Sequence, residues 1–318
     1  MVRIKELDVF RGIAALNVVI FHYTSRYRMN FGHNYPQYLD WEIGRYGVEL
    51  FFMISGFVIF MSLQGNTSIE SFAKKRFARL YPEYWICVCL TFLVLSIAAD
   101  PEVETVSPPV LLLNLTMVQG VFNVKSVDGV YWSLIPELFF YFTIGLLYYL
   151  GQFSRIRIFG AVWLSLMILN SLFALPFGAY LLNLQYGMFF MAGILFYRLK
   201  FSMGGWQEHA LILLSFIAAL CSHPGLAQAY VYLLIYLLFY LFTYGMLNKI
   251  SWKPLVFLGY ISYPLYLIHQ NVGFVLMRTL NRYLSSELLV LLLTISTMIT
   301  LAWLITSLVR AVYIRVYA

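Results

Sequence analysis

Charged residues are scarce in this sequence. Aspartate, glutamate, lysine and arginine make up 11% of its 318 residues, whereas hydrophobic residues make up 62% and aromatic residues 19%. A water-soluble domain of this length cannot bury so much apolar surface, so the composition excludes a soluble globular protein. The lipid bilayer is the solvent that fits.

The sequence has three cysteines and does not indicate a cleavable leader. Cys87, Cys89 and Cys221 lie in apolar runs, where they are expected to pack as small hydrophobic residues without forming disulfides. The first 25 residues hold basic side chains before an apolar stretch, but no small-residue cleavage site follows. We expect a retained first helix.

Long apolar runs fill most of the chain. A spanning helix needs roughly 20 mainly apolar residues. Ten such runs are found, near residues 7–25, 44–63, 82–99, 132–150, 156–174, 177–197, 207–222, 228–247, 255–277 and 286–309. The pattern predicts an all-α polytopic membrane bundle of about ten transmembrane helices, forming a single domain over residues 1–318 with no soluble domain.

The basic residues predict the orientation of this bundle. If the N-terminus is cytoplasmic, 15 of the 21 lysine and arginine residues face the cytoplasm and six face the outside. This asymmetry follows the positive-inside rule. The net charge of +7 then reflects membrane topology, and a nucleic-acid partner is not expected.

The first helix carries three ionisable side chains. Such groups are costly inside a membrane and usually functional. Arg11 and His22 are 11 residues apart, which puts them on one helical face about 16 Å apart along the axis, and Asp8 shares that face. This arrangement suggests a cation near the cytoplasm and an imidazole deep in the membrane, although His22 could instead be an interhelical hydrogen-bonding residue.

Two carboxylates are expected at a depth similar to that of His22. Glu49 enters the second helix from the outer side, and Glu137 follows the motif Trp132–Leu134 in the fourth. Either carboxylate could orient a histidine base and stabilise its cation. In the alternative, both glutamates pair with Arg26 or Arg45.

A basic amphipathic stretch over residues 71–80 lies in a cytoplasmic connection. Arg76 and Arg79 share one helical face and could bind phosphate, while Lys74 and Lys75 add charge. Attraction to anionic lipid headgroups explains the same stretch equally well.

Five motifs in order give the chain a resemblance to a known family. They are Arg11 with ten residues before His22, Gly47–Phe57, the Arg76 and Arg79 pair before Leu80–Pro82, Trp132–Leu134 ahead of Glu137, and Ser262–His269. Together they resemble the acyltransferase-3 family. The resemblance implies about ten transmembrane helices, cytoplasmic acetyl-CoA as donor, and O-acylation of polysaccharide or other acceptors.

The resemblance also implies site residues. His22 would be the catalytic histidine, and Arg11, Arg76 and Arg79 would be needed for activity. Two departures stand out: Leu138 replaces a second acidic residue that many relatives carry, and no extracellular esterase-like domain precedes Ala318. This membrane domain is therefore expected to complete the transfer itself.

The expected site combines both sources. Its catalytic residues are His22, Glu49 and Glu137; its acyl-CoA-binding residues are Arg11, Lys75, Arg76 and Arg79; its supporting residues are Asp8, Asp128, Trp132, Tyr263 and His269. No metal and no permanently bound cofactor are expected, because acyl-CoA is a co-substrate. The expected partners are membrane lipid and a carbohydrate acceptor, and the expected location is the bacterial inner membrane.

Several alternatives stay open at this point. The charged residues could form a relay in a transporter or flippase, although an inverted repeat is lacking. A binding subunit without turnover is a third class. Within the enzyme reading, a covalent acyl-histidine competes with direct transfer. Asn114–Thr116 fits both a glycosylation sequon and a re-entrant turn.

Overall fold

Helices dominate the structure, which is a computed structural model describing residues 4–32, 39–65, 68–173, 182–248 and 250–317. Every regular element among these residues is a helix. The α-helices are α1 (Lys5–Phe21), α2 (Tyr27–Phe31), α3 (Gly47–Leu63), α4 (Ile69–Ala98), α5 (Pro108–Asn114), α6 (Leu134–Tyr149), α7 (Ile156–Phe173), α8 (Gly187–Lys200), α9 (Trp206–Ser222), α10 (Leu226–Thr243), α11 (Lys253–Tyr260), α12 (Ser262–Asn281) and α13 (Glu287–Tyr317). Short π or 3-10 helices are η1 (His22–Arg26), η3 (Glu42–Tyr46), η4 (Gln119–Phe122), η5 (Gly129–Ser133) and η6 (Phe153–Arg155).

Six helical segments in the described ranges are long and apolar enough to cross a membrane. They are Glu42–Leu63, Ile69–Ala98, Gly129–Tyr149, Phe153–Phe173, Leu226–Thr243 and Glu287–Val312, and Trp206–Ser222 is a shorter apolar helix. The helical membrane architecture is thus confirmed. Ten spans and a cytoplasmic N-terminus stay predictions, as does the single domain.

The chain divides into two compact units, each assembled from separate stretches. The first unit comprises Met1–Phe10, Val48–Lys75 and Pro136–Ser251. Its central helix is α8, in which 12 of 14 residues are buried by contacts that include α7, α9 and α10.

Glycines let α3 approach α8 closely. A Cβ on Gly56 would lie 2.0 Å from the carbonyl oxygen of Phe190, and a Cβ on Gly193 would lie 2.0 Å from that of Met53. Each glycine therefore admits the backbone of the other helix. Gly56, within the Gly47–Phe57 motif, thus has a packing role in the structure.

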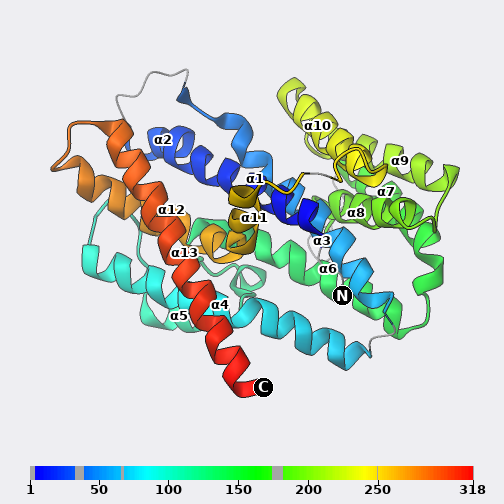
Figure 1. The fold of residues 1–318 in the computed structure, drawn as a ribbon, viewed down its shortest axis with the longest axis horizontal. Helices are drawn as coiled ribbons and strands as arrows, with labels where there is room; N and C mark the ends of the chain where they lie inside the picture. Colours follow the sequence, from blue (N-terminus) through cyan, green and yellow to red (C-terminus); the bar gives the residue numbers. More distant parts are fainter. Residues whose placement is uncertain (1–3, 33–38, 66–67, 174–181, 249, 318) are drawn as a thin grey trace. The chain divides into compact units, whose positions relative to one another are not determined.

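The second unit comprises Arg11–Gly47, Arg76–Ile135 and Trp252–Ala318. Figure 1 shows its long helices α12 and α13, coloured orange and red, running side by side. The short helices η1 and η5 both contact α12. Residues 22–26 and 129–133, far apart in the sequence, are thereby brought to one helix.

Three of the differences from the predicted boundaries concern helices that carry predicted site residues. The run expected at 82–99 belongs to a 30-residue helix beginning at Ile69, with Pro82 inside it, so the basic stretch is continuous with the span. The run at 7–25 changes to a π-helix at His22. The run at 255–277 breaks at Ile261, because Pro264 suits a first helical turn, where backbone N–H groups have no helical acceptor.

Candidate active site

His22 opens the π-helix η1, directly after α1. Its ring is half-buried. The Nδ1 atom lies 2.8 Å from the carbonyl oxygen of Val18, and a carbonyl can only accept, so this nitrogen carries the proton. Single π turns inside helices often mark functional sites. The sequence reading missed this feature, because it expected regular α-helix through residue 25.

The second ring at this place is that of His269, which is fully buried in α12. Its Nδ1–H donates to the carbonyl oxygen of Tyr266 at 2.7 Å. Its Nε2 atom lies 3.1 Å from Nδ1 of His22, and the ring centroids are 4.7 Å apart. His22 and His269, which the sequence analysis proposed separately, are therefore in direct contact.

These hydrogen bonds assign the tautomers. Because Nδ1 of His269 is a donor, Nε2 of the neutral ring is an acceptor, and it receives the Nδ1–H of His22. Nε2 of His22 is then left with a lone pair. The pair thus presents one unprotonated nitrogen, which is what a general base requires.

Tyr23 fixes His269 from the neighbouring position in η1. Its hydroxyl donates to the carbonyl oxygen of His269 at 2.6 Å. The phenol fits because residue 273 is glycine: a Cβ there would lie 2.2 Å from the Tyr23 oxygen. Neither residue was singled out from the sequence, because the contact joins positions about 250 residues apart.

Asp128, predicted as a supporting residue, ties the loop before η5 to α12. It is fully buried. Its Oδ1 accepts from the backbone N–H of Val130 at 3.1 Å and its Oδ2 from that of Asn271 at 2.9 Å. Burial raises the pKa of the Asp128 carboxyl to about 7, while these backbone bonds favour the charged form. Asp128 therefore holds α12 two residues beyond His269.

The tryptophan motif reaches the same helix through its serine. Ser133 and Tyr266 share a hydrogen bond of 2.7 Å between their hydroxyls, and the Tyr266 hydroxyl donates to the carbonyl oxygen of Val130. Trp132 itself is 41% exposed. Two of the family-like motifs thus meet directly, with Ser133 as the contact that the sequence did not identify.

Asn114 organises the loop that precedes Asp128. It is fully buried, its Nδ2 donates to the carbonyl oxygens of Val110 and Lys125, and its Oδ1 accepts from Val127. All polar atoms of this carboxamide are engaged. The structural reading of Asn114 is therefore favoured over the glycosylation reading.

The predicted phosphate-binding arginines lie on α4, as does Glu83. Arg79 is exposed, and its guanidinium lies 3.7 Å from the buried Glu83 carboxylate and 5.7 Å from the ring centroid of Tyr263. The Tyr263 hydroxyl donates to the carbonyl oxygen of Leu80. Arg76 lies one turn earlier and is half-buried. Arg76 and Arg79 share one helical face, as predicted. Glu83, which the sequence analysis did not name, pairs with Arg79 one turn further along the same helix.

Arg11 is half-buried on α1, beside a close packing point. A Cβ on Gly12 would lie 2.2 Å from the carbonyl oxygen of Leu255 in α11. On the same short helix, Tyr260 lies under the guanidinium of Arg310 at 4.1 Å. Arg11 therefore lies one residue before the contact of α1 with α11, and Arg310 packs on the end of α11.

The remaining predicted residues belong to the first unit. Glu137 Oε1 accepts from the Ser55 hydroxyl at 2.8 Å and from the Tyr141 hydroxyl. Glu49 and Asp8 are buried, and Lys75 is exposed. His22 belongs to the second unit, so a role for either glutamate beside it stays a prediction.

Comparisons with known proteins identify the family of the chain. The model of a family described as an acyltransferase domain matches residues 4–307. Acyltransferase MdmB of Streptomyces mycarofaciens is 28% identical over 42% of this chain and 36% of its own length. ORF330 of Acidianus two-tailed virus, named as a candidate acetyltransferase, is 26% identical over 84% of this chain and 82% of its own.

A third relative is nodulation protein 10 of Rhizobium leguminosarum bv. viciae. It is 25% identical over 52% of this chain and 50% of its own length. The chain thus spans about a third of MdmB and half of the nodulation protein. No solved structure matches the chain.

The family match covers nearly the whole chain, including both histidines and the helices that carry them. This helical integral membrane protein therefore belongs to the acyltransferase-3 family.

Proposed function

We propose that the chain is an O-acyltransferase of the bacterial inner membrane. It moves an acyl group, acetyl in the usual case, from cytoplasmic acyl-CoA to a hydroxyl of a surface polysaccharide or lipid-linked glycan. The observation that carries the proposal is the unprotonated Nε2 of His22, maintained by the bonds of Nδ1 to Val18 and His269.

The chemistry follows from this nitrogen. An alcohol is a weak nucleophile near neutral pH, so its attack on a thioester needs a base. Nε2 of His22 takes the hydroxyl proton while the oxygen bonds to the carbonyl carbon. The carbon–sulfur bond then breaks, and the proton on His22 passes to the departing sulfur.

His269 stabilises the cation formed in between. When His22 becomes doubly protonated, its Nδ1–H still has two acceptors, the Val18 carbonyl and Nε2 of His269. Glu49 or Glu137 would add negative charge if they approach the ring. Direct transfer is the simpler proposal, because it requires no covalent intermediate on the imidazole.

The donor would be held by the basic groups. Arg76 and Arg79 lie on one face of α4, and guanidinium groups suit phosphate through paired hydrogen bonds. Arg11 and Lys75 would supplement them. Tyr263, under Arg79, orients that side chain and belongs to the helix that carries His269.

The decisive experiment measures release of free thiol from acetyl-CoA by purified protein, using neutral glycosides as acceptors. We expect His22→Ala to lower turnover by a factor on the order of hundreds or more, while acetyl-CoA still raises its unfolding temperature. His209→Ala is the matched control, because His209 bonds Tyr240 and Tyr244 in the first unit. Wild-type turnover in His22→Ala would refute the base, and absence of thiol release would favour a transporter.

A further inference from the structure

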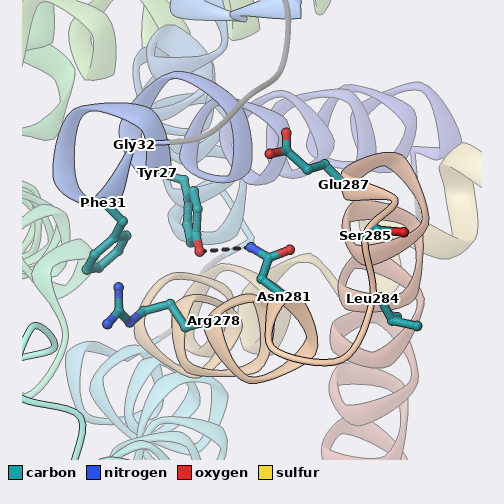
Figure 2. Close-up of a pocket in the computed structure, with 8 residues that line it drawn as sticks. All are labelled: Tyr27, Phe31, Gly32, Arg278, Asn281, Leu284, Ser285 and Glu287. Atoms are coloured by element: carbon teal, nitrogen blue, oxygen red, sulfur yellow. Dashed lines mark hydrogen bonds between the residues drawn. The ribbon is translucent and has the colours of Figure 1, made fainter.

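The second unit contains a polar hollow of about 800 Å³. This volume falls within the usual range for small-molecule sites, roughly 300–1,000 Å³. Figure 2 shows its lining, which comes from α2 and the residue after it, the end of α12, the α12–α13 connection and the first residue of α13: Tyr27, Phe31, Gly32, Arg278, Asn281, Leu284, Ser285 and Glu287. None of these residues belongs to the site described above.

Phe274 connects the hollow to the histidine pair. Its ring centroid is 6.4 Å from that of His22, 5.8 Å from that of Tyr27 and 5.4 Å from that of Phe31. Tyr27 is also only five residues beyond His22 in the chain. One aromatic ring therefore separates the hollow from the proposed base.

The lining combines aromatic rings with neutral hydrogen-bonding groups. Asn281 donates to the Tyr27 hydroxyl at 3.2 Å, and Ser285 adds an exposed hydroxyl. Leu284 is the one aliphatic member of the set. A hydrocarbon chain would cover the Ser285 hydroxyl without bonding to it, whereas a ring bearing several hydroxyls can use both kinds of surface.

The charges around the hollow argue against an anionic occupant. Arg278 donates to Asp100 at 2.6 Å and to Glu102 at 2.9 Å, and its guanidinium lies 4.8 Å from the ring centroid of Phe31. This cation is already neutralised by two carboxylates. Among the described residues, Arg278 is the one basic residue of the lining, so a carboxylate or phosphate on the ligand would find that charge already compensated.

We infer that this hollow binds an uncharged glycosyl unit of the acceptor, adjacent to the unit whose hydroxyl meets His22. The inference rests on the proposed function, and the positive-inside rule predicts that α2 and the α12–α13 connection face the outside, where a surface glycan would arrive. Tyr27, Asn281 and Glu287 are then determinants of acceptor specificity.

The test measures binding independently of catalysis. Ser285→Cys is placed in a chain whose Cys89 and Cys221 are serine, and its alkylation by a maleimide is timed with and without methyl glycosides. Gluco-, galacto-, manno- and rhamnosides are the neutral probes, and methyl glucuronide is the charged probe. We expect at least one neutral glycoside to slow labelling several-fold, with glucuronide slowing it much less.

Two controls make the result specific. Ser286→Cys is exposed but outside the lining, so its labelling should not respond to sugar. The protection of Ser285→Cys should persist when His22→Ala is added. The inference is overturned if no neutral glycoside protects, if glucuronide protects as well as the neutral sugars, or if Ser286→Cys is protected equally.

A kinetic arm then separates this inference from the proposed function. Asn281→Ala should raise the acceptor KM about tenfold with little change in kcat, and acetyl-CoA should still stabilise the variant. An unchanged KM would count against the hollow as an acceptor site. Sugar protection without any thiol release in the wild type would refute the transferase while leaving the sugar site in place.

Discussion

In the described part of its unit, His22 is oriented by the neutral imidazole of His269. In many hydrolases a carboxylate has this role. His269 is fully buried, and an ionised group there would carry a large desolvation cost. A second histidine provides the required acceptor without a permanent charge. The trade-off is a weaker stabilisation of the His22 cation.

The first prediction concerns His269 as a positioning residue. We expect His269→Leu to lower kcat at least about tenfold, because Nδ1 of His22 loses one acceptor. His269→Gln should retain more activity, since its amide oxygen can accept the same hydrogen. The KM for acetyl-CoA should stay constant in both, and equal losses in the two variants would indicate a purely structural role.

At this scale the sequence predicted the ionisable residues and missed their partners. His22, Asp128 and His269 could be proposed because polar groups in or near apolar helices are costly and conspicuous. Tyr23, Ser133 and Asn271 are ordinary residues whose importance depends on contacts across long sequence separations. Such contacts are properties of the fold.

Among the elements, α3 and α8 leave no room for a Cβ at Gly56 or at Gly193. Gly56→Ala should destabilise the protein by at least about 1 kcal/mol, because a methyl group cannot share space with the Phe190 carbonyl. Thermal unfolding in detergent measures this. Gly65→Ala is the control, since the nearest atom to its Cβ is 3.9 Å away, and a similar loss there would refute the packing argument.

The connection before α5 is fastened to α12 by an ion pair that responds to pH. The hydrogen bond from Arg278 holds the pKa of the Asp100 carboxyl below its usual 3.8. A lowered folded-state pKa stabilises the fold above about pH 4, and this contribution disappears as the pH falls through the lowered value.

Asp100→Asn should therefore lower the unfolding temperature at pH 7. The difference from the wild type should shrink as the pH falls below 4. Glu104→Gln is the control, because Glu104 forms its ion pair with Lys125 on the exposed surface. Exposed ion pairs contribute little to stability. A wild-type advantage that does not shrink at all as the pH falls below 4 would contradict the assignment.

Hydropathy predicted the helical elements well and their breaks less well. Each of the ten apolar runs contains helix, because a long apolar segment must satisfy its backbone internally. The π turn at His22 and the break at Ile261 depend on local backbone choices that apolar composition does not encode. Pro264 was the one available signal for that break.

For the whole molecule, the charge asymmetry predicts the orientation. Ser107→Cys lies in an expected outer loop and Ser154→Cys in an expected inner loop, and both positions are exposed. In intact cells, a membrane-impermeant maleimide should label residue 107 alone, in a chain whose Cys89 and Cys221 are serine. Labelling of residue 154 alone would reverse the predicted topology.

The division into two units could not have been read from the chain order. Each unit is built from three separate stretches, and helix α4 is divided between them after Lys75, which separates Lys75 from Arg76 and Arg79. Hydropathy identifies helices one at a time. Which helices pack together depends on side-chain shape, as at Gly56 and Gly273.

The wide turn at His22–Arg26 has a consequence for how this gene can vary. A π turn holds one residue more than an α-helical turn, so losing one residue from η1 would close it to α-helix and change which of its side chains face His269. Amino-acid replacements in this stretch act at one position each, whereas a change in its length would alter the link between the imidazole and the sugar-sized hollow in a single step.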